Sequence, residues 1–170
     1  MDLASFTVEP MLDGLDTISW DDLPQPEWNG SGEVPKALLA IAAIVNQRDA
    51  DAAYNRFLYA LGNNHAGTYY PVALWAIPFL GSLLATGTSI VRETVLDILI
   101  DLTGSFVAES GFESARGPTS SELPLDVGVR QVVASLRSEI QTCHASEPID
   151  SRARDLAAEL IQLLDEPPPD

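Results

Sequence analysis

NNHAGTYYPVALWAIPFLGSLL, residues 63–84, is the stretch that decides the fold class. From Pro71 onward it is apolar nearly all round a helix, which is typical of a helix buried on every side. Pro78 lies inside this pattern, where a proline removes one backbone hydrogen bond and kinks a helix. The apolar run is too short to cross roughly 30 Å of hydrocarbon. We therefore predict a central buried helix within residues 68–84 of an all-α protein.

Further segments of helical periodicity lie on both sides of this helix. The spacing of apolar residues predicts helices over 34–46, 49–62, 68–84, 88–103, 125–144 and 150–165. Asp49 is expected to cap the second helix and Gly62 to end it. Short turns join the helices in pairs, which predicts about three antiparallel hairpins of the size found in α-solenoid repeats. No segment alternates apolar and polar residues for long enough to require a strand.

The segments outside these helices suggest a lead-in, a body and a tail. Residues 1–32 mix acids, prolines and glycines with aromatic residues, which indicates an irregular, acidic lead-in packed on the body. The helical domain is expected over 33–166. Within it, residues 104–124 form a connection much longer than a usual helix–helix loop, so this loop is expected to be functional or disordered. Residues 167–170 are expected to form an extended tail.

Acidic residues dominate the chain, with a formal net charge of −16 over 170 residues. Such a field repels nucleic acid and anionic membranes and attracts basic partners. Residues 1–35 contain no Lys or Arg, and clustering of one charge sign indicates a contact surface or a loosely held arm more than uniform solubilisation. The candidate partner-binding residues of the lead-in are Asp13, Asp16, Trp20, Asp21, Asp22, Glu27 and Trp28.

A second candidate contact surface lies on the predicted helix 88–103. Its inward stripe is Val91, Val95, Ile98 and Leu102, and Glu93, Asp97 and Asp101 form a column on the opposite side. Like charges four residues apart destabilise a helix by about 0.2–0.5 kcal/mol per pair. The column therefore does not serve helix stability, and it is either a contact surface or a plain solvated face.

Motifs for catalysis are missing from the sequence. His65 and His144 are far apart in the chain, and neither belongs to a nucleophile elbow, a Cys–His signature or a metal-ligand pair. His65 is expected to serve a turn, while Tyr69, Tyr70 and Trp75 are expected to pack between helices. We expect no catalytic residue, no metal site, no cofactor and no enzymatic activity.

Two features indicate a cytoplasmic protein. The single cysteine, Cys143, excludes an intrachain disulfide, which fits a reducing compartment. The first residues, MDLASFTVEPML, have neither a basic region nor a long apolar region, so a cleaved secretion signal is not expected.

Trp20, Leu23, the run GEVPKALLAIA at 32–42 and the run at 63–84 resemble a family of small bacterial HEAT-like repeat proteins. In that family a tryptophan lead-in precedes a helix that starts at a Val-Pro pair. A His-x-Gly-x-x-Tyr loop then precedes an Ala-rich helix that ends in a Val/Ile-Pro-Phe-Leu motif. The resemblance covers residues 20–102 and does not extend to the long loop.

The resemblance implies a right-handed stack of antiparallel helical hairpins, a HEAT-like α-solenoid. Some proteins of this kind are similar to immunity proteins that neutralise a toxin from another bacterium. We therefore expect an immunity protein that occludes the active cleft of a basic toxin, with aromatic anchors such as Trp20 or Trp28. If the toxin is a nuclease, the acidic surface would stand in for phosphates.

Two other hypotheses stay open. The protein could be a scaffold or assembly module without a toxin partner. It could also bind or transform a small molecule on the concave side of the stack, with His65, Tyr69 and nearby acids. The sequence identifies neither the partner nor the oligomeric state.

Overall fold

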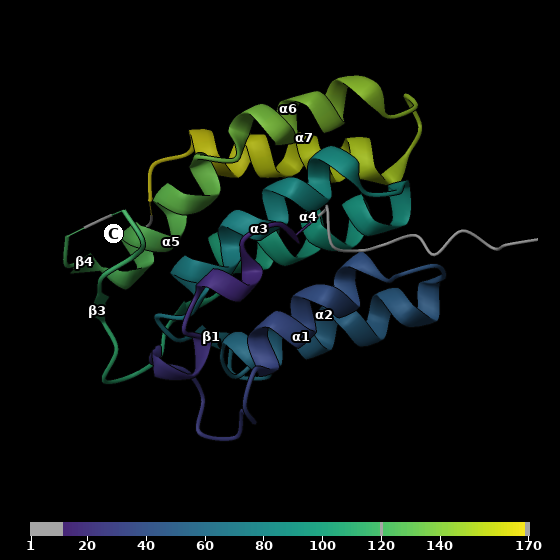
Figure 1. Ribbon diagram of the computed structural model, residues 1–170. Coiled ribbons are helices and arrows are strands. Elements are labelled where there is room, and N and C mark those ends of the chain that lie inside the picture. The colour runs from purple at the N-terminus through teal and green to yellow at the C-terminus, as the bar shows by residue number, and fades with distance from the viewer. Residues whose placement is uncertain (1–11, 120, 169–170) are drawn as a thin grey trace, which may run out of the picture.

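The computed structural model describes residues 12–119 and 121–168 (Figure 1). These residues form seven α-helices, two short 3-10 helices and four strands of two residues each. The prediction of an all-α fold is confirmed, because the strands only pin loops to the helical body.

Helices that follow one another in the chain are in contact in three groups. The first is α1 (Glu33–Ala42) with α2 (Gln47–Leu61), and the second is α3 (Ala73–Thr86) with α4 (Ser89–Gly104). In the third, α6 (Arg137–Ser146) packs against α7 (Arg152–Asp165), and α5 (Leu125–Ala134) leads into α6 and packs on α3 and α4.

The hairpins lie side by side, so that their helices make two layers. In one layer α3 packs between α1 on one side and α5 and α6 on the other. In the second layer α4 packs between α2 and α7. Figure 1 shows the first layer in front and the second behind it. The core lies between the layers, and α3 supplies much of it, with Leu74, Ile77, Leu80 and Leu83 almost fully buried. The prediction of a central buried helix is confirmed, but its predicted bounds of 68–84 are wrong, because Thr68–Tyr69 form a strand and the helix runs from Ala73 to Thr86.

The boundary between α1 and α2 differs from the prediction. α1 ends at Ala42, and α2 begins at Gln47 with Asn46 as its cap. The Asn46 side chain accepts from the Asp49 N–H at 2.9 Å, and the Asp49 carboxylate accepts from the Val45 N–H at 3.2 Å. Asn46 is therefore the cap, and Asp49 lies in the first turn of α2, where it bonds to the residue before the cap.

The helix predicted over 125–144 is also different, because it is interrupted. α5 ends at Ala134, and α6 starts at Arg137. At the break, the Ser135 hydroxyl donates to the Val132 carbonyl at 2.5 Å, and Leu136 lies against Gly81 of α3. The break turns the chain while the apolar stripe continues through it.

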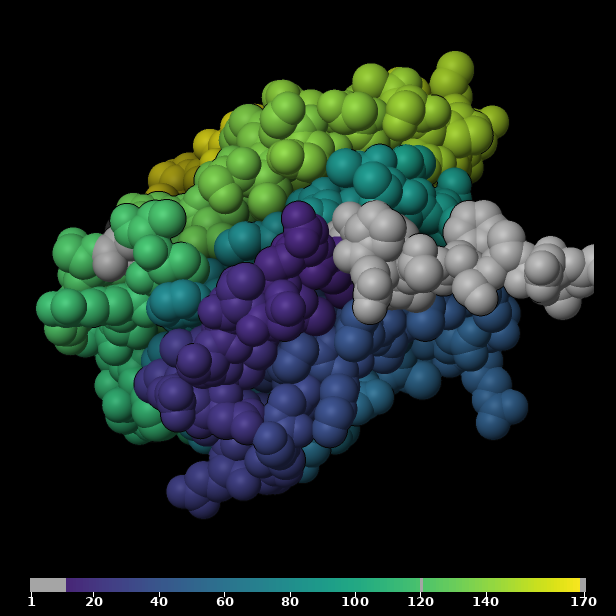
Figure 2. Space-filling model, in the orientation of Figure 1, coloured from purple at the N-terminus to yellow at the C-terminus, as the bar shows by residue number. Residues whose placement is uncertain are grey.

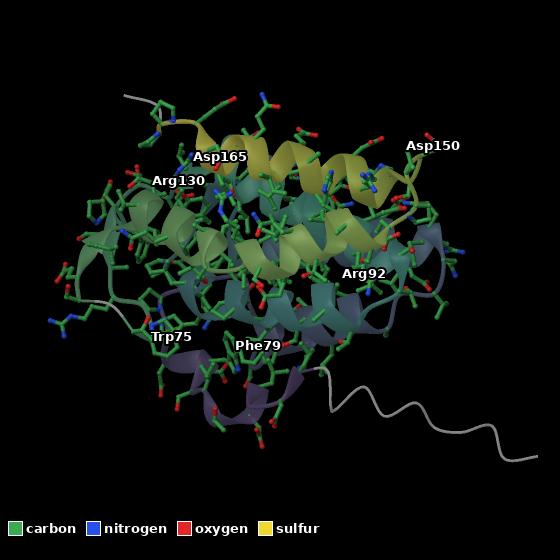
Figure 3. All side chains as sticks on the ribbon, turned by 90° about the horizontal axis from the view of Figure 1, so that it is seen from above. Trp75, Phe79, Arg92, Arg130, Asp150 and Asp165 are labelled. Atoms are coloured by element: carbon green, nitrogen blue, oxygen red, sulfur yellow. The ribbon has the colours of Figure 1, made fainter. Side chains whose placement is uncertain are left out.

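The described part of the lead-in packs on the layer that contains α1 and α3. It includes the 3-10 helices η2 (Leu15–Thr17) and η3 (Trp20–Asp22). The Trp20 ring centroid is 5.9 Å from that of Phe79, and the Val72 N–H donates to the Pro24 carbonyl at 3.0 Å. Figure 2 shows the lead-in in purple, lying between the first hairpin and the green α5 and α6. Figure 3 shows Trp75 and Phe79 on the side of α3 that faces it.

The long loop is ordered in its described residues. β2 (Val107–Ala108) pairs in parallel with β1 (Thr68–Tyr69), and β3 (Ser114–Ala115) pairs antiparallel with β4 (Leu123–Pro124). The Thr68 hydroxyl and the Glu109 carboxylate are 2.5 Å apart, and the ring centroids of Phe112 and Tyr70 are 4.8 Å apart. Strands of two residues are too short to produce a recognisable alternation in the sequence.

Candidate functional site

An acidic groove of about 600 Å³ crosses the layer of α2, α4 and α7. Carboxylates from all three helices line it: Asp51, Glu93, Asp97, Asp101 and Glu159. Arg152 is the one basic residue among the described residues of the lining. The column of Glu93, Asp97 and Asp101 that the sequence predicts on one helix is thus part of a groove built by three.

Arg152 and Tyr54 hold part of the acidic column in place. Arg152, at the start of α7, lies 2.7 Å from Asp97 and 3.7 Å from Glu93. The hydrogen bond to Asp97, followed by the nearby charges, raises the pKa of Arg152. The Tyr54 hydroxyl of α2 donates to Asp101. Desolvation first, and then Asp101, raise the pKa of Tyr54, so this phenol stays protonated and keeps donating at neutral pH.

The rest of the lining of the groove is less polar. Ala50, Ile90, Ile100 and Leu156 line it together with Thr94. The Thr94 hydroxyl donates to the Ile90 carbonyl at 2.9 Å, so it is already satisfied within α4. Apolar side chains together with carboxylates in one groove suit the aliphatic stem and charged end of a Lys or Arg side chain.

The candidate acids of the lead-in lie away from this groove. Asp13, Asp16, Asp22 and Glu27 are exposed on the described lead-in. The lead-in packs in front of α3, whereas α4 lies behind it (Figure 1). The structure therefore separates the predicted contact residues into two surfaces, one on each layer.

Asp21 has a structural partner within the chain. Its carboxylate accepts from the Ser31 hydroxyl at 2.5 Å and from the Gly32 N–H at 2.8 Å, just before α1 begins. These two hydrogen bonds, the Ser31 bond first, lower the pKa of Asp21. Asp21 thus fastens the lead-in to the start of α1, a role the sequence did not indicate.

The two candidate tryptophan anchors differ in exposure. Trp20 is only 6% exposed, and its indole N–H donates to the Leu15 carbonyl at 2.8 Å. The prediction that Trp20 anchors a partner is wrong, since a ring buried in the chain's own core has little area to offer. Trp28 is 44% exposed and stacks on Tyr59 with ring centroids 5.0 Å apart, so it remains available to a partner.

The loop around His65 is a turn. His65 is exposed, and the Asn63 side chain accepts from the N–H groups of His65 and Ala66, both at 3.1 Å. This is the geometry of an Asx turn. Tyr69 is buried at 1% exposure, as the packing interpretation predicts. Among the described residues, no group of three or more His, Cys, Asp or Glu side chains is arranged to bind a metal ion.

Several groove residues were missed by sequence reasoning. Asp51 and Tyr54 come from α2, and Arg152 and Glu159 come from α7. Each lies on a polar helix face that looks like ordinary solvated surface. Only the packing of α2 and α7 against α4 brings them to the acidic column, and no local pattern reports that packing.

Within the described part of the chain, no helix is both long and apolar enough to cross a membrane. Comparison with protein families, with curated proteins and with solved structures finds no match. The function therefore has to be argued from the acidic groove itself.

Proposed function

We propose that the protein binds a basic segment of another protein in the acidic groove, and that it acts as an immunity protein against a basic bacterial toxin. The observation that carries the proposal is the groove of three helices, whose walls hold five carboxylates and one guanidinium. The toxin as partner rests on the family resemblance of residues 20–102 and on the charge.

The same arrangement supports the finer fold hypothesis. Hairpins whose first helices share one layer and whose second helices share the other are typical of stacked helical repeats. We propose a right-handed, HEAT-like stack, with the groove on the layer of second helices.

Binding would work by exchange and occlusion. A Lys or Arg of the partner would compete with Arg152 for Asp97 and Glu93, and Arg152 can swing away because its side chain is 55% exposed. The overall charge of −16 would speed the encounter with a basic partner. The bound segment would then be withheld from the partner's own substrate.

The test separates the groove from general acidity by means of two variants with equal charge change. The groove variant is Glu93→Gln with Asp97→Asn, and the control is Asp16→Asn with Asp22→Asn on the lead-in. Each protein serves as bait in extracts of its native bacterium at low and high salt. The captured protein is then purified and titrated by calorimetry, and its toxicity is measured with and without each bait.

Support requires a basic toxin that binds in a defined ratio, loses its toxicity on binding, and loses affinity for the groove variant but not for the control. Equal losses in both variants would overturn the groove as the site. Capture of a large assembly whose members are not toxic would favour the scaffold hypothesis instead.

A further inference from the structure

A second cavity, of about 370 Å³, lies where α4 ends and α5 begins. Leu102, Phe106, Val107, Val127 and Ala134 make its lining largely apolar. Its lining residues are all different from those of the acidic groove. Its size falls in the range of pockets that enclose small molecules, roughly 300–1,000 Å³.

Tyr69 brings a hydroxyl group to the lining of this cavity. The residue is 1% exposed and lines the cavity together with Asp126. Its carbonyl accepts from the Glu109 N–H at 2.9 Å, but its hydroxyl makes no hydrogen bond to any described residue. The hydroxyl can therefore bond to a molecule that enters the cavity.

The protonation of Tyr69 makes it a hydrogen-bond donor. Desolvation first, and then the charge of Asp126, raise its pKa. A protonated phenol that lines a cavity can donate to an acceptor on a molecule that fills it.

Arg130 supplies further donors at the same place. Its Nη2 donates to the Leu163 carbonyl at 2.5 Å and to the Glu166 carbonyl, which fixes the guanidinium beside the end of α7 (Figure 3). Its Nε and Nη1 have no partner among the described residues. A guanidinium carries five N–H donors, so this one can hold α7 and still donate into the cavity.

We propose that this cavity binds a small molecule with an apolar body and a neutral amide group. The amide oxygen accepts from the Tyr69 hydroxyl and from Arg130, and the amide N–H donates to Asp126. The apolar body contacts Leu102, Phe106 and Val127. A carboxylate in the same place could pair with Arg130, but it has no N–H to donate to Asp126 and would face the negative charge of Asp126, so the amide is favoured.

Phenylbutanamide and phenylbutanoate are a matched pair of test compounds, since they differ only in the amide and carboxylate ends. Each is titrated into the full chain while backbone amide NMR signals are followed. The amide compound is expected to shift signals of residues 102–107 and 126–134 and to bind about tenfold more tightly than the carboxylate.

Tyr69→Phe removes only the hydroxyl and should weaken binding of the amide about fivefold or more. Tyr59→Phe, on the exposed side of α2, should leave it unchanged.

Val127→Trp is a second variant that does not touch the buried tyrosine. Val127 is 41% exposed at the cavity, so a larger side chain there fills the space without entering the core. It should abolish binding of the amide compound and leave the groove unaffected. Shifts spread evenly over the surface, an absence of shifts, equal affinity for both compounds, or unchanged affinity in Tyr69→Phe and Val127→Trp would each overturn the proposal.

Discussion

The hydroxyl groups of Tyr54 and Tyr69 lie in two different environments. The Tyr54 hydroxyl donates to Asp101, whereas that of Tyr69 has no partner among the described residues. Tyr54→Phe should therefore lower the free energy of unfolding by about 1–2 kcal/mol. Tyr69→Phe should leave it unchanged or raise it, because no bond is lost. Urea unfolding of both variants tests this, and an equal loss in both would contradict the assignment of partners.

The raised pKa values of the same two tyrosines give stability a dependence on pH. The folded state favours the neutral phenol, and this preference adds to the free energy of unfolding. The added stability is complete below the tyrosine pKa of the unfolded state, near 10.0, and is lost as the pH rises above it. Stability should fall on going from pH 9 to about pH 11. The fall should be shallower in Tyr54→Phe and Tyr69→Phe than in Tyr59→Phe. Equal slopes in all three variants would contradict the prediction.

Glu147 and Asp165 form two ion pairs that differ in burial. The Glu147 side chain is 2% exposed, bonds to Arg92 at 3.0 Å and accepts from the Ser89 hydroxyl. Asp165 bonds to Arg137 at 2.7 Å but is 62% exposed. Glu147→Ala should lower the free energy of unfolding by about 3–5 kcal/mol, since it leaves the partly buried guanidinium of Arg92 without its ion-pair partner. Asp165→Ala should cost less than about 1 kcal/mol. Thermal and urea unfolding would rule out this ranking if the two costs were similar.

At the scale of elements, the turn from α2 to β1 depends on a close backbone approach at Gly62. A Cβ there would lie 2.0 Å from the Thr68 carbonyl oxygen, a backbone atom that has little room to move. Gly62→Ala should therefore lower the free energy of unfolding by about 1–3 kcal/mol. Gly30→Ala is the matched control, because a Cβ at Gly30 meets nothing within 4 Å. Its effect should stay within about 0.5 kcal/mol, and a similar loss in both variants would contradict the steric explanation.

The helices that the sequence predicts well are those whose ends carry their own signals. α4 and α7 begin within two residues of their predicted starts, at Ser89 and Arg152. The break between α5 and α6 was missed because Val129, Val133, Leu136 and Ile140 keep one apolar stripe across it. Periodicity reports which face is buried, not whether the backbone is continuous.

The acidic column on α4 could be predicted from helical periodicity, but the residues from other helices that surround it could not. Glu93, Asp97 and Asp101 belong to one helix, so their common face follows from helical geometry. Tyr54 and Arg152 reach the same groove from α2 and α7, which are far from α4 in sequence. Their approach depends on tertiary packing of the two layers, and so does the burial of Trp20.

At the scale of the whole molecule, net charge and groove geometry should act on different rate constants. The electrostatic field of a net charge of −16 acts at long range, and salt at 0.1 M screens it over a distance of about 10 Å. It should therefore govern association with a basic partner. The groove acts only after contact, through Asp97 and Glu93, and should govern dissociation.

Stopped-flow binding of a fluorescent Lys/Arg-rich peptide would separate the two contributions. Raising salt from about 0.02 M to about 0.3 M should slow association about tenfold or more, with a smaller change in dissociation. Asp16→Asn with Asp22→Asn should mainly slow association. Glu93→Gln with Asp97→Asn carries the same charge change, but it should also speed dissociation severalfold, because it removes the contacts that Arg152 now occupies. If the two double variants behave alike in both rate constants, the peptide senses only the field, and the groove is not its binding site.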